Sequence, residues 1–190
     1  EGLVEPGPGV TYPYSEFFRT RILDAIFTCQ SNPKLACENP QFLQELEQDI
    51  TDQHCDAVLS FLEDQNIEMS DIDLIGFHGQ TVLHQADEGV TLQIGSGSRM
   101  RDALGITVVN DFRTADVKAG GEGAPLVPVY HQALSSSLDL RYPAVFLNLG
   151  GVANITYIGP AGELIGFDTG PANALIDDWV SSNSSQTYDD

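Results

Sequence analysis

The chain contains 190 residues, of which 28 are acidic and 8 are Lys or Arg, so its formal net charge is −20. This charge excludes nucleic acid and anionic membranes as expected partners, because like charges repel. The apolar content of 42% is typical of a globular chain, and no apolar run reaches the roughly 20 residues that span a bilayer. The first ten residues are rich in Pro, Gly and acid, unlike a signal peptide, so we expect a cytoplasmic location.

Two helices are predicted first. Apolar residues recur at helical spacing over residues 15–29, and Ser15 is placed to cap this helix. A loop is expected around two Asn-Pro pairs at 32–33 and 39–40. A long amphipathic helix is expected over residues 40–65, with an acidic face in solvent. The three cysteines form no Cys-x-x-Cys pair, so we interpret them as reduced thiols rather than as a disulfide or zinc framework.

Short apolar runs, many of them ending in glycine, then predict strands, several of them buried on both faces. The predicted strands are residues 74–77, 91–95, 106–109, 144–147, 154–158 and 164–167. Helices are expected over 98–104 and 124–134, and a last helix is expected to begin at Pro171 and end near Val180, before a polar tail at 181–190. Tight turns among the last three strands indicate an antiparallel meander. The fold class is therefore α/β with a mixed sheet.

Most polar and glycine-rich segments follow predicted strands, where open α/β sheets bind ligands. The turn at His78, Gly79 and Gln80 offers an imidazole and an amide for sugar hydroxyls, although such a turn is also common as plain structure. Arg113 lies beside a glycine loop at 118–123 and suits a carboxylate ligand. An internal Arg113–Asp116 salt bridge is the equally simple alternative.

Two further segments lie near the C-terminal end of the sequence. Gly150 and Gly151 connect two predicted strands, either as an ordinary hairpin or as a loop whose backbone N–H groups face phosphate oxygens. Asp168 ends a strand just before a helix, so its carboxylate is either a general base aimed into a crevice or part of the turn. From the residues alone, both alternatives stay open at each position.

Taken together and in this order, the segments resemble the anhydro-N-acetylmuramic acid kinases of the sugar kinase/Hsp70/actin superfamily. The matching motifs are IGFHGQT at 75–81, TLQIG at 91–95, DFR at 111–113, GAPLVP at 123–128, NLGG at 148–151 and GFDTGP at 166–171. The resemblance is dense from 74 to 179 and diffuse before that. It implies an actin-like ATPase fold that is incomplete in this chain. Residues 1–143 would form most of a sugar-facing domain, and residues 144–190 would begin a nucleotide-side domain.

The resemblance also implies a reaction. The family uses ATP and Mg²⁺ to open the 1,6-anhydro bond of its amino sugar with water and to phosphorylate O6. It implies that Asp168 is the catalytic base. Residues implied to line the sugar site are His78, Gln80, Arg113, Asp116, Gly170 and Asn173, and those implied to meet nucleotide phosphate are Gly150, Gly151 and Asn154. Metal ligands are not implied, and a homodimer is expected.

Some features depart from the family pattern. Glu122 stands where Gln is usual, and Ala172 replaces a usual Gly. The family's N-terminal Ser-Gly-Thr-Ser phosphate loop and its later adenosine-side motif are missing, so we expect a fragment that does not turn over substrate alone. Two alternatives remain: a non-catalytic domain that senses sugars or muropeptides, and a kinase for an ordinary hexose.

Overall fold

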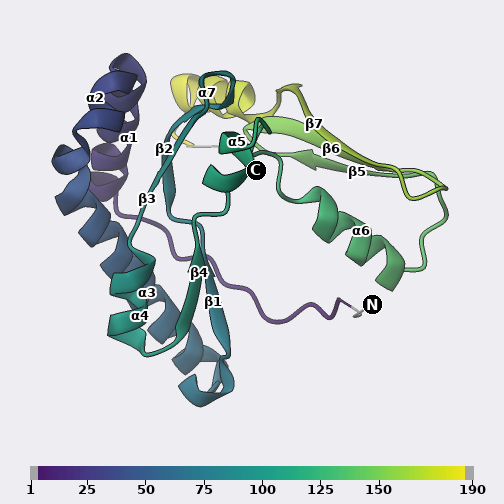
Figure 1. The fold of residues 1–190 in the computed structure, drawn as a ribbon, viewed down its shortest axis with the longest axis horizontal. Coiled ribbons are helices and arrows are strands. Elements are labelled where there is room, and N and C mark those ends of the chain that lie inside the picture. The colour runs from purple at the N-terminus through teal and green to yellow at the C-terminus, as the bar shows by residue number, and fades with distance from the viewer. Residues whose placement is uncertain (1–3, 187–190) are drawn as a thin grey trace. The chain divides into compact units, whose positions relative to one another are not determined.

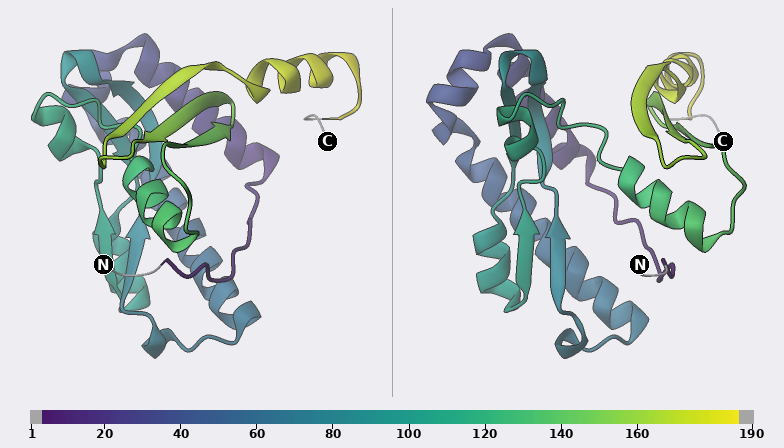
Figure 2. Two further views of the ribbon diagram at one scale, coloured as in Figure 1. Left: turned by 90° about the vertical axis from the view of Figure 1, so that its right-hand side faces the viewer. Right: turned by 45° about the vertical axis from the view of Figure 1, so that its right-hand side comes forward.

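The computed structural model describes residues 4–186, which divide into two compact units. The first unit comprises residues 7–123, and the second comprises residues 124–186 together with 4–6. Figures 1 and 2 show the helices and strands of each unit. Within the described range, no helix is both long enough and apolar enough to cross a membrane. The expected division into sugar-facing and nucleotide-side domains at residue 143 stays a prediction.

The two predicted N-terminal helices are confirmed. Helix α1 spans Glu16–Ser31, and the Ser15 side chain caps it by accepting a hydrogen bond from the Phe18 amide at 3.2 Å. Helix α3 spans Gln44–Gln65 and ends at Asn66, whose left-handed backbone conformation terminates the helix. Its buried side chains face the core while its acidic side chains face outward, as the amphipathic pattern predicts.

The predicted loop between these helices is wrong in one respect. Residues Pro33–Glu38 form a short helix, α2, because the Asn32 side chain accepts from the Leu35 amide and Pro33 suits the first helical position. The second Asn-Pro pair starts a 3-10 turn, η1 (Pro40–Leu43), that leads directly into α3. Both prolines therefore begin helices instead of forming an open loop.

The strands of the first unit form two separate pairs. Strands β1 (Leu74–Phe77) and β4 (Thr107–Asn110) are parallel, whereas β2 (Gln80–Gln85) and β3 (Val90–Ile94) form an antiparallel hairpin. Strand β2 was not predicted, since residues 78–81 were interpreted as a turn. The other elements are α4 (Gly97–Leu104), α5 (Thr114–Lys118) and the 3-10 turns η2 (Met69–Asp71) and η3 (Ala86–Glu88). The short α5 was also missed, inside the expected glycine loop.

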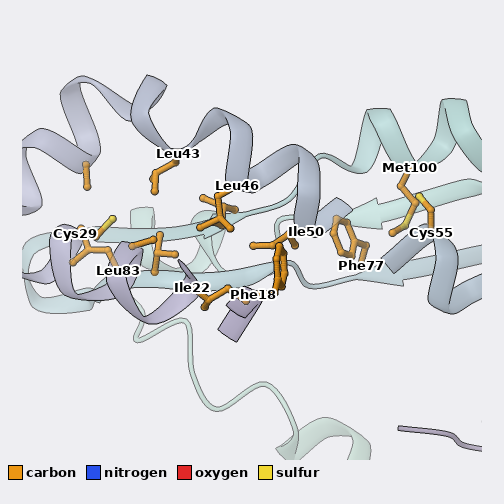
Figure 3. Close-up of a cluster of buried hydrophobic side chains, with 14 of the residues drawn as sticks. Phe18, Ile22, Cys29, Leu43, Leu46, Ile50, Cys55, Phe77, Leu83 and Met100 are labelled. Atoms are coloured by element: carbon orange, nitrogen blue, oxygen red, sulfur yellow. The ribbon is translucent and has the colours of Figure 1, made fainter. Parts of the chain in front are cut away.

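A continuous apolar core holds the first unit together (Figure 3). Sixteen buried residues from α1, α2, η1, α3, β1 to β3 and α4, with Ile106 just before β4, form one cluster. Ile50 is fully buried, and Leu83 and Met100 are nearly so. Burial of this kind contributes about 1.5–3 kcal/mol per large apolar side chain, so the helices and strands of this unit stabilise one another.

The second unit contains the predicted antiparallel meander. Strands β5 (Ala144–Leu149), β6 (Val152–Ile158) and β7 (Leu164–Pro171) pair in chain order. Helix α6 spans Pro128–Ser137 rather than the predicted 124–134, because Pro128 occupies its first turn. The contacts of α6 with β6 and β7 place it in this unit.

The predicted start of the last helix is wrong. Pro171 is the last residue of β7 and pairs with Val152, and α7 begins two residues later, spanning Asn173–Asn183. Proline lacks an N–H, so it can stand where a strand ends as well as where a helix begins. Part of the predicted polar tail is thus helical, and its residues 187–190 lie outside the described residues.

The expectation that several strands are buried on both faces is wrong for β1, β4, β5 and β7, which are largely exposed. In the second unit, α6 covers one face of the sheet, whereas the other face exposes apolar side chains from 48% to 60% of their surface. These residues are Val145, Leu147, Leu149, Ile165 and Phe167. Leu74 and Val109 in the β1–β4 pair are exposed as well, because no described element packs over them. What is confirmed is a mixed α/β fold with parallel and antiparallel pairing.

Candidate active-site clusters

The first cluster lies where the two parallel strands of the first unit end. Phe77 and Asn110 are register partners at the ends of β1 and β4, so the next residues of each strand lie at the same edge. His78 follows β1 directly. Asp111 follows β4 with a positive φ of 57°, which turns the chain toward Arg113 and α5. This edge is where α/β sheets place ligand-binding residues.

Arg113 is held by two hydrogen bonds. Its Nε donates to His78 Nε2 at 2.9 Å, and its Nη1 donates to the Gly123 carbonyl at 2.6 Å. Because His78 Nε2 accepts, the proton of this neutral imidazole must be on Nδ1, which donates to the Gly79 carbonyl at 2.8 Å. The Nη2 amino group of Arg113 has no hydrogen-bond partner among the described residues. The guanidinium is therefore fixed in direction and still has donors for a ligand.

Asp116 stabilises the glycine loop whose Gly123 carbonyl binds Arg113. Its carboxylate accepts from the Gly123 amide at 2.7 Å, and a side chain at Gly121 would collide with the same carboxylate. Gly123 has a φ of +64°, and a Cβ there would lie 2.6 Å from Val117 Cγ2. Gly123 is thus required by the fold of the loop, because only glycine combines a positive φ with such close packing, whereas Gly121 is required only by its contact with the Asp116 carboxylate.

The salt-bridge alternative for Arg113 does not hold, since no Arg113–Asp116 ion pair occurs within residues 4–186. The two side chains instead bind different backbone groups of Gly123, Arg113 its carbonyl and Asp116 its amide. Gln80 begins β2, and its Nε2 donates to the Thr81 carbonyl at 3.1 Å, so its side chain is not part of the Arg113 network. The structure brings three of the four predicted residues of this unit together.

The second cluster is a row of polar side chains across the sheet of the second unit. Asn148, Asn154 and Asp168 are successive register partners on β5, β6 and β7. Directly opposed residues of antiparallel strands share one face with Cβ atoms about 4.5–5.5 Å apart. None of the three side chains makes a hydrogen bond or ion pair in the described structure. We call these three residues the polar row.

A β-bulge stands beside the polar row. The register changes between Ala153 and Asn154, so Thr169 is the extra residue of β7, and its hydroxyl donates to the Ala153 carbonyl at 3.1 Å. Gly170, with a φ of +144°, follows and resumes the pairing. Bulges are common next to active sites because they redirect the neighbouring side chains.

The Gly150–Gly151 turn lies at the same end of the sheet. Neither glycine has a positive φ, so the turn is not of the primed hairpin type. The two carbonyls accept from the backbone amides of Asn173 and Ala172, at 2.9 and 3.0 Å. Asn173 also donates its side-chain amide to the Leu149 carbonyl at 3.0 Å. The start of α7 is therefore bound to this turn, and the glycine N–H groups have no partner in the described range.

Comparison with known proteins decides the family. The family model for anhydro-N-acetylmuramic acid kinase matches residues 5–190. A protein of that name from Methylobacterium nodulans is 52% identical over 152 residues, which cover 80% of this chain and 41% of the relative. Relatives of the same name from Rhizobium etli and Agrobacterium fabrum are each 44% identical, over 99% and 100% of this chain and 51% of their own length.

This chain belongs to the anhydro-N-acetylmuramic acid kinase family. It spans about half the length of the curated relatives it matches. Membership in this kinase family implies the actin-like sugar-kinase fold that the resemblance predicted, and the mixed α/β organisation agrees with it. The resemblance stated from the sequence motifs is thereby confirmed.

The residues present can be tested against the ATP and Mg²⁺ that an anhydro-N-acetylmuramic acid kinase implies. The unpartnered N–H groups of Gly150 and Gly151, without a Cβ to block approach, fit phosphate oxygens. Asp168 supplies one exposed carboxylate, and within residues 4–186 no group of three His, Cys, Asp or Glu side chains could hold a metal. This donor set fits a magnesium ion that is bound mainly through phosphate oxygens.

Sequence reasoning missed one residue of the polar row, Asn148. Asn148 belongs to the NLGG motif, but only the register shows that it lies in line with Asn154 and Asp168. The available signal was its position two residues after Phe146 on the same strand, because residues two apart on a strand share a face. His131 of α6 was also missed; burial lowers the pKa of its imidazole, and no motif pointed to it.

Proposed function

We propose that this chain provides part of an ATP-dependent kinase that opens 1,6-anhydro-N-acetylmuramic acid with water and phosphorylates O6. The product would be N-acetylmuramic acid 6-phosphate. The observation that carries the proposal is the free carboxylate of Asp168, in the polar row beside the Gly150–Gly151 turn, in a member of this kinase family.

Asp168 acts as the general base in this proposal. Its carboxylate removes a proton from the water that attacks the anomeric carbon C1, while the C1–O6 bond breaks. ATP, when bound, supplies the phosphoryl group that O6 captures, and Mg²⁺ offsets charge on the phosphates. A single carboxylate suffices because phosphoryl transfer takes up the leaving oxygen, whereas an ordinary glycosidase needs a second carboxylic acid.

The first unit contributes recognition of the sugar. Arg113 has a fixed guanidinium with free donors, which suits the lactyl carboxylate of the substrate. His78 orients that guanidinium, and Asp116 holds the loop around it. Gln80, Gly170 and Asn173 remain proposed sugar-site residues. For the phosphates we propose the Gly150–Gly151 backbone and the Asn154 amide, in a cytoplasmic, homodimeric enzyme.

The test uses the full product of the gene with ATP, Mg²⁺ and anhydro-N-acetylmuramic acid in ¹⁸O-labelled water. Mass spectrometry should find a phosphorylated sugar that carries one ¹⁸O at C1. An unlabelled phosphosugar would exclude water attack at C1. The absence of any phosphosugar, despite measurable sugar binding, would favour a sensing domain. Faster phosphorylation of glucose than of the anhydro sugar would favour an ordinary hexose kinase.

The base is tested with two matched substitutions. Asp168→Asn should lower kcat by at least about 1,000-fold with sugar binding largely retained, because the amide cannot take a proton at neutral pH. Asp178→Asn on α7 removes an exposed carboxylate of the same unit and should leave kcat unchanged. Near-normal turnover in Asp168→Asn would remove Asp168 from the mechanism.

A further inference from the structure

Helix α6 meets the sheet of the second unit along one cross-strand row. Phe146, Thr156 and Gly166 are register partners on β5, β6 and β7, and all three lie on the face that α6 covers. Figures 1 and 2 show α6 beside this sheet. We call these residues the clamp row, since each is contacted by α6 or by the segment leading into it.

A single histidine of α6 makes two of these contacts. The His131 ring stacks on Phe146 with centroids 4.6 Å apart and planes 5° from parallel. Its Nδ1 lies 2.9 Å from Thr156 Oγ1, and Thr156 is fully buried. Within the described residues, the Thr156 side chain makes no other hydrogen bond. A buried hydroxyl without a partner is costly, so this pairing fixes the distance between α6 and β6.

The third contact depends on the absence of a side chain. A Cβ at Gly166 would lie 2.5 Å from Pro128 Cγ and 3.2 Å from Pro125 Cγ. Glycine therefore allows the start of α6 and the preceding segment to lie directly on β7. With His131 on β5 and β6, the helix is in contact with all three strands along the same row.

The clamp row is the immediate neighbour of the polar row. Each strand advances by two residues between them, from Phe146 to Asn148, from Thr156 to Asn154 and from Gly166 to Asp168. Residues two apart on a strand share a face and are about 6.5–7 Å apart. A displacement of β6 or β7 in the clamp row would therefore be transmitted directly to Asn154 or Asp168.

We propose that His131, through its hydrogen bond to Thr156, is a positioning residue that sets the alignment of the polar row. It does not touch the reacting atoms; it holds the strands that carry them. The kinetic part of this inference rests on the proposed kinase function. The imidazole is suited to the role in its neutral form, which accommodates a flat stack against Phe146 and one directed hydrogen bond.

The kinetic test compares matched variants of the full gene product. His131→Phe keeps an aromatic ring and loses the hydrogen bond, and Thr156→Val keeps the shape and loses the hydroxyl. Each should lower kcat about tenfold with the KM for sugar changed less than about twofold, since misplacing a catalytic group affects the chemical step. His131→Phe/Thr156→Val should resemble either single variant, because both remove the same bond. His131→Asn, which can still hydrogen-bond near the Nδ1 position, should recover to within about threefold of the parent enzyme.

Val129→Ala is the control, because Val129 lies on α6 and is 68% exposed. It should leave kcat and KM unchanged. If His131→Phe and Thr156→Val lower the unfolding midpoint but leave kcat intact, the residues serve packing alone and the positioning role is refuted. The positioning role would also be refuted if the loss in kcat of the double variant equalled the product of the two single losses.

A second readout is independent of kinase activity. In ¹⁵N-labelled chain, the side-chain amide resonances of Asn148 and Asn154 should shift in His131→Phe and in Thr156→Val, and not in Val129→Ala. Unmoved resonances would overturn the positioning role. If the parent enzyme fails to phosphorylate the sugar, the proposed function fails, yet these resonances still decide whether His131 aligns the polar row.

Discussion

The two compact units hold their polar residues in different ways. In the first unit, His78, Arg113 and Asp116 are bound to one another or to the backbone of the Gly123 loop. In the second unit, Asn148, Asn154 and Asp168 are aligned by strand register, and their side chains have no partner within the described residues. The first arrangement is fixed by internal hydrogen bonds and leaves only part of the Arg113 guanidinium free, whereas the second leaves all its side-chain hydrogen-bonding capacity for a ligand.

The two units also differ in how completely their apolar side chains are packed. The first unit has one continuous core around α1, α3 and β2, whereas the second leaves a whole sheet face of apolar side chains exposed. Rigidity in the second unit therefore has to come from the α6 side of the sheet. Matched substitutions in the two units test whether this difference in packing holds in solution.

The largest difference is expected in stability. Ile50→Ala should lower the free energy of unfolding by about 2–5 kcal/mol, because Ile50 is fully buried and leaves a cavity. Leu147→Ala should change it by less than about 0.5 kcal/mol, because that side chain is already 60% exposed. Urea unfolding followed by circular dichroism measures both. Equal losses would mean that the exposed face is covered in solution.

The glycine loop of the first unit should be the next most sensitive region. Gly121→Ala should destabilise the first unit by about 1–3 kcal/mol, because the new methyl group collides with the Asp116 carboxylate. Gly9→Ala is the control, since nothing lies within 4 Å of a Cβ there. Thermal unfolding of both variants provides the measurement. An unchanged midpoint for Gly121→Ala would show that the loop adapts without cost.

The acidic residues of the two clusters should respond differently to neutralisation. Asp116→Asn should destabilise the chain by about 1 kcal/mol, because it weakens a charge-assisted hydrogen bond to the Gly123 amide. Asp168→Asn should leave stability within about 0.5 kcal/mol of the parent chain, because the carboxylate has no partner to lose. Chemical unfolding of the pair tests this. A loss for Asp168→Asn as large as that for Asp116→Asn would mean that Asp168 is structurally engaged.

The smallest effect is a pH dependence in the second unit. Burial lowers the pKa of His131 below its ordinary value of 6.5, so below that pH the unfolded chain binds a proton that the folded unit resists. The stability that neutral, buried His131 contributes to the folded unit is fully present above pH 6.5 and is lost as the pH falls through the lowered pKa of His131. Unfolding midpoints between pH 7.5 and 5 should show a slope in the parent chain and a shallower slope in His131→Asn. Identical slopes in the two proteins would show that His131 does not cause this pH dependence.

The sequence was most informative where local signals and motifs coincided. The Ser15 cap, the amphipathic α3 and the strand runs predicted those elements, since capping and periodicity act within a few residues. It was wrong at two prolines, because proline can begin a helix, as Pro33 does, or end a strand, as Pro171 does. It also missed β2, whose residues 80–85 show no clear alternation and pair only through β3.

The candidate sites show the same limit. Motifs identified Arg113, Asp168 and the paired glycines as chemically important, but not what each one contacts. The Arg113–His78 bond joins residues 35 positions apart, and the polar row depends on strand register and on a bulge at Thr169. Such relations arise from tertiary packing, and the exposed face of the second sheet shows that apolar runs alone do not determine burial.

The hydrogen bond that fixes Arg113 also determines the reactivity of His78. Its Nε2 lone pair is already committed to the guanidinium, and its Nδ1 proton to the Gly79 carbonyl. This imidazole is therefore neither a nucleophile nor a ready ligand for Zn²⁺ or Ni²⁺, because a metal ion would first have to displace Arg113. In the first unit, then, the ring nitrogens of a histidine predicted to line the sugar site are both occupied, and its contribution is the direction in which Arg113 points.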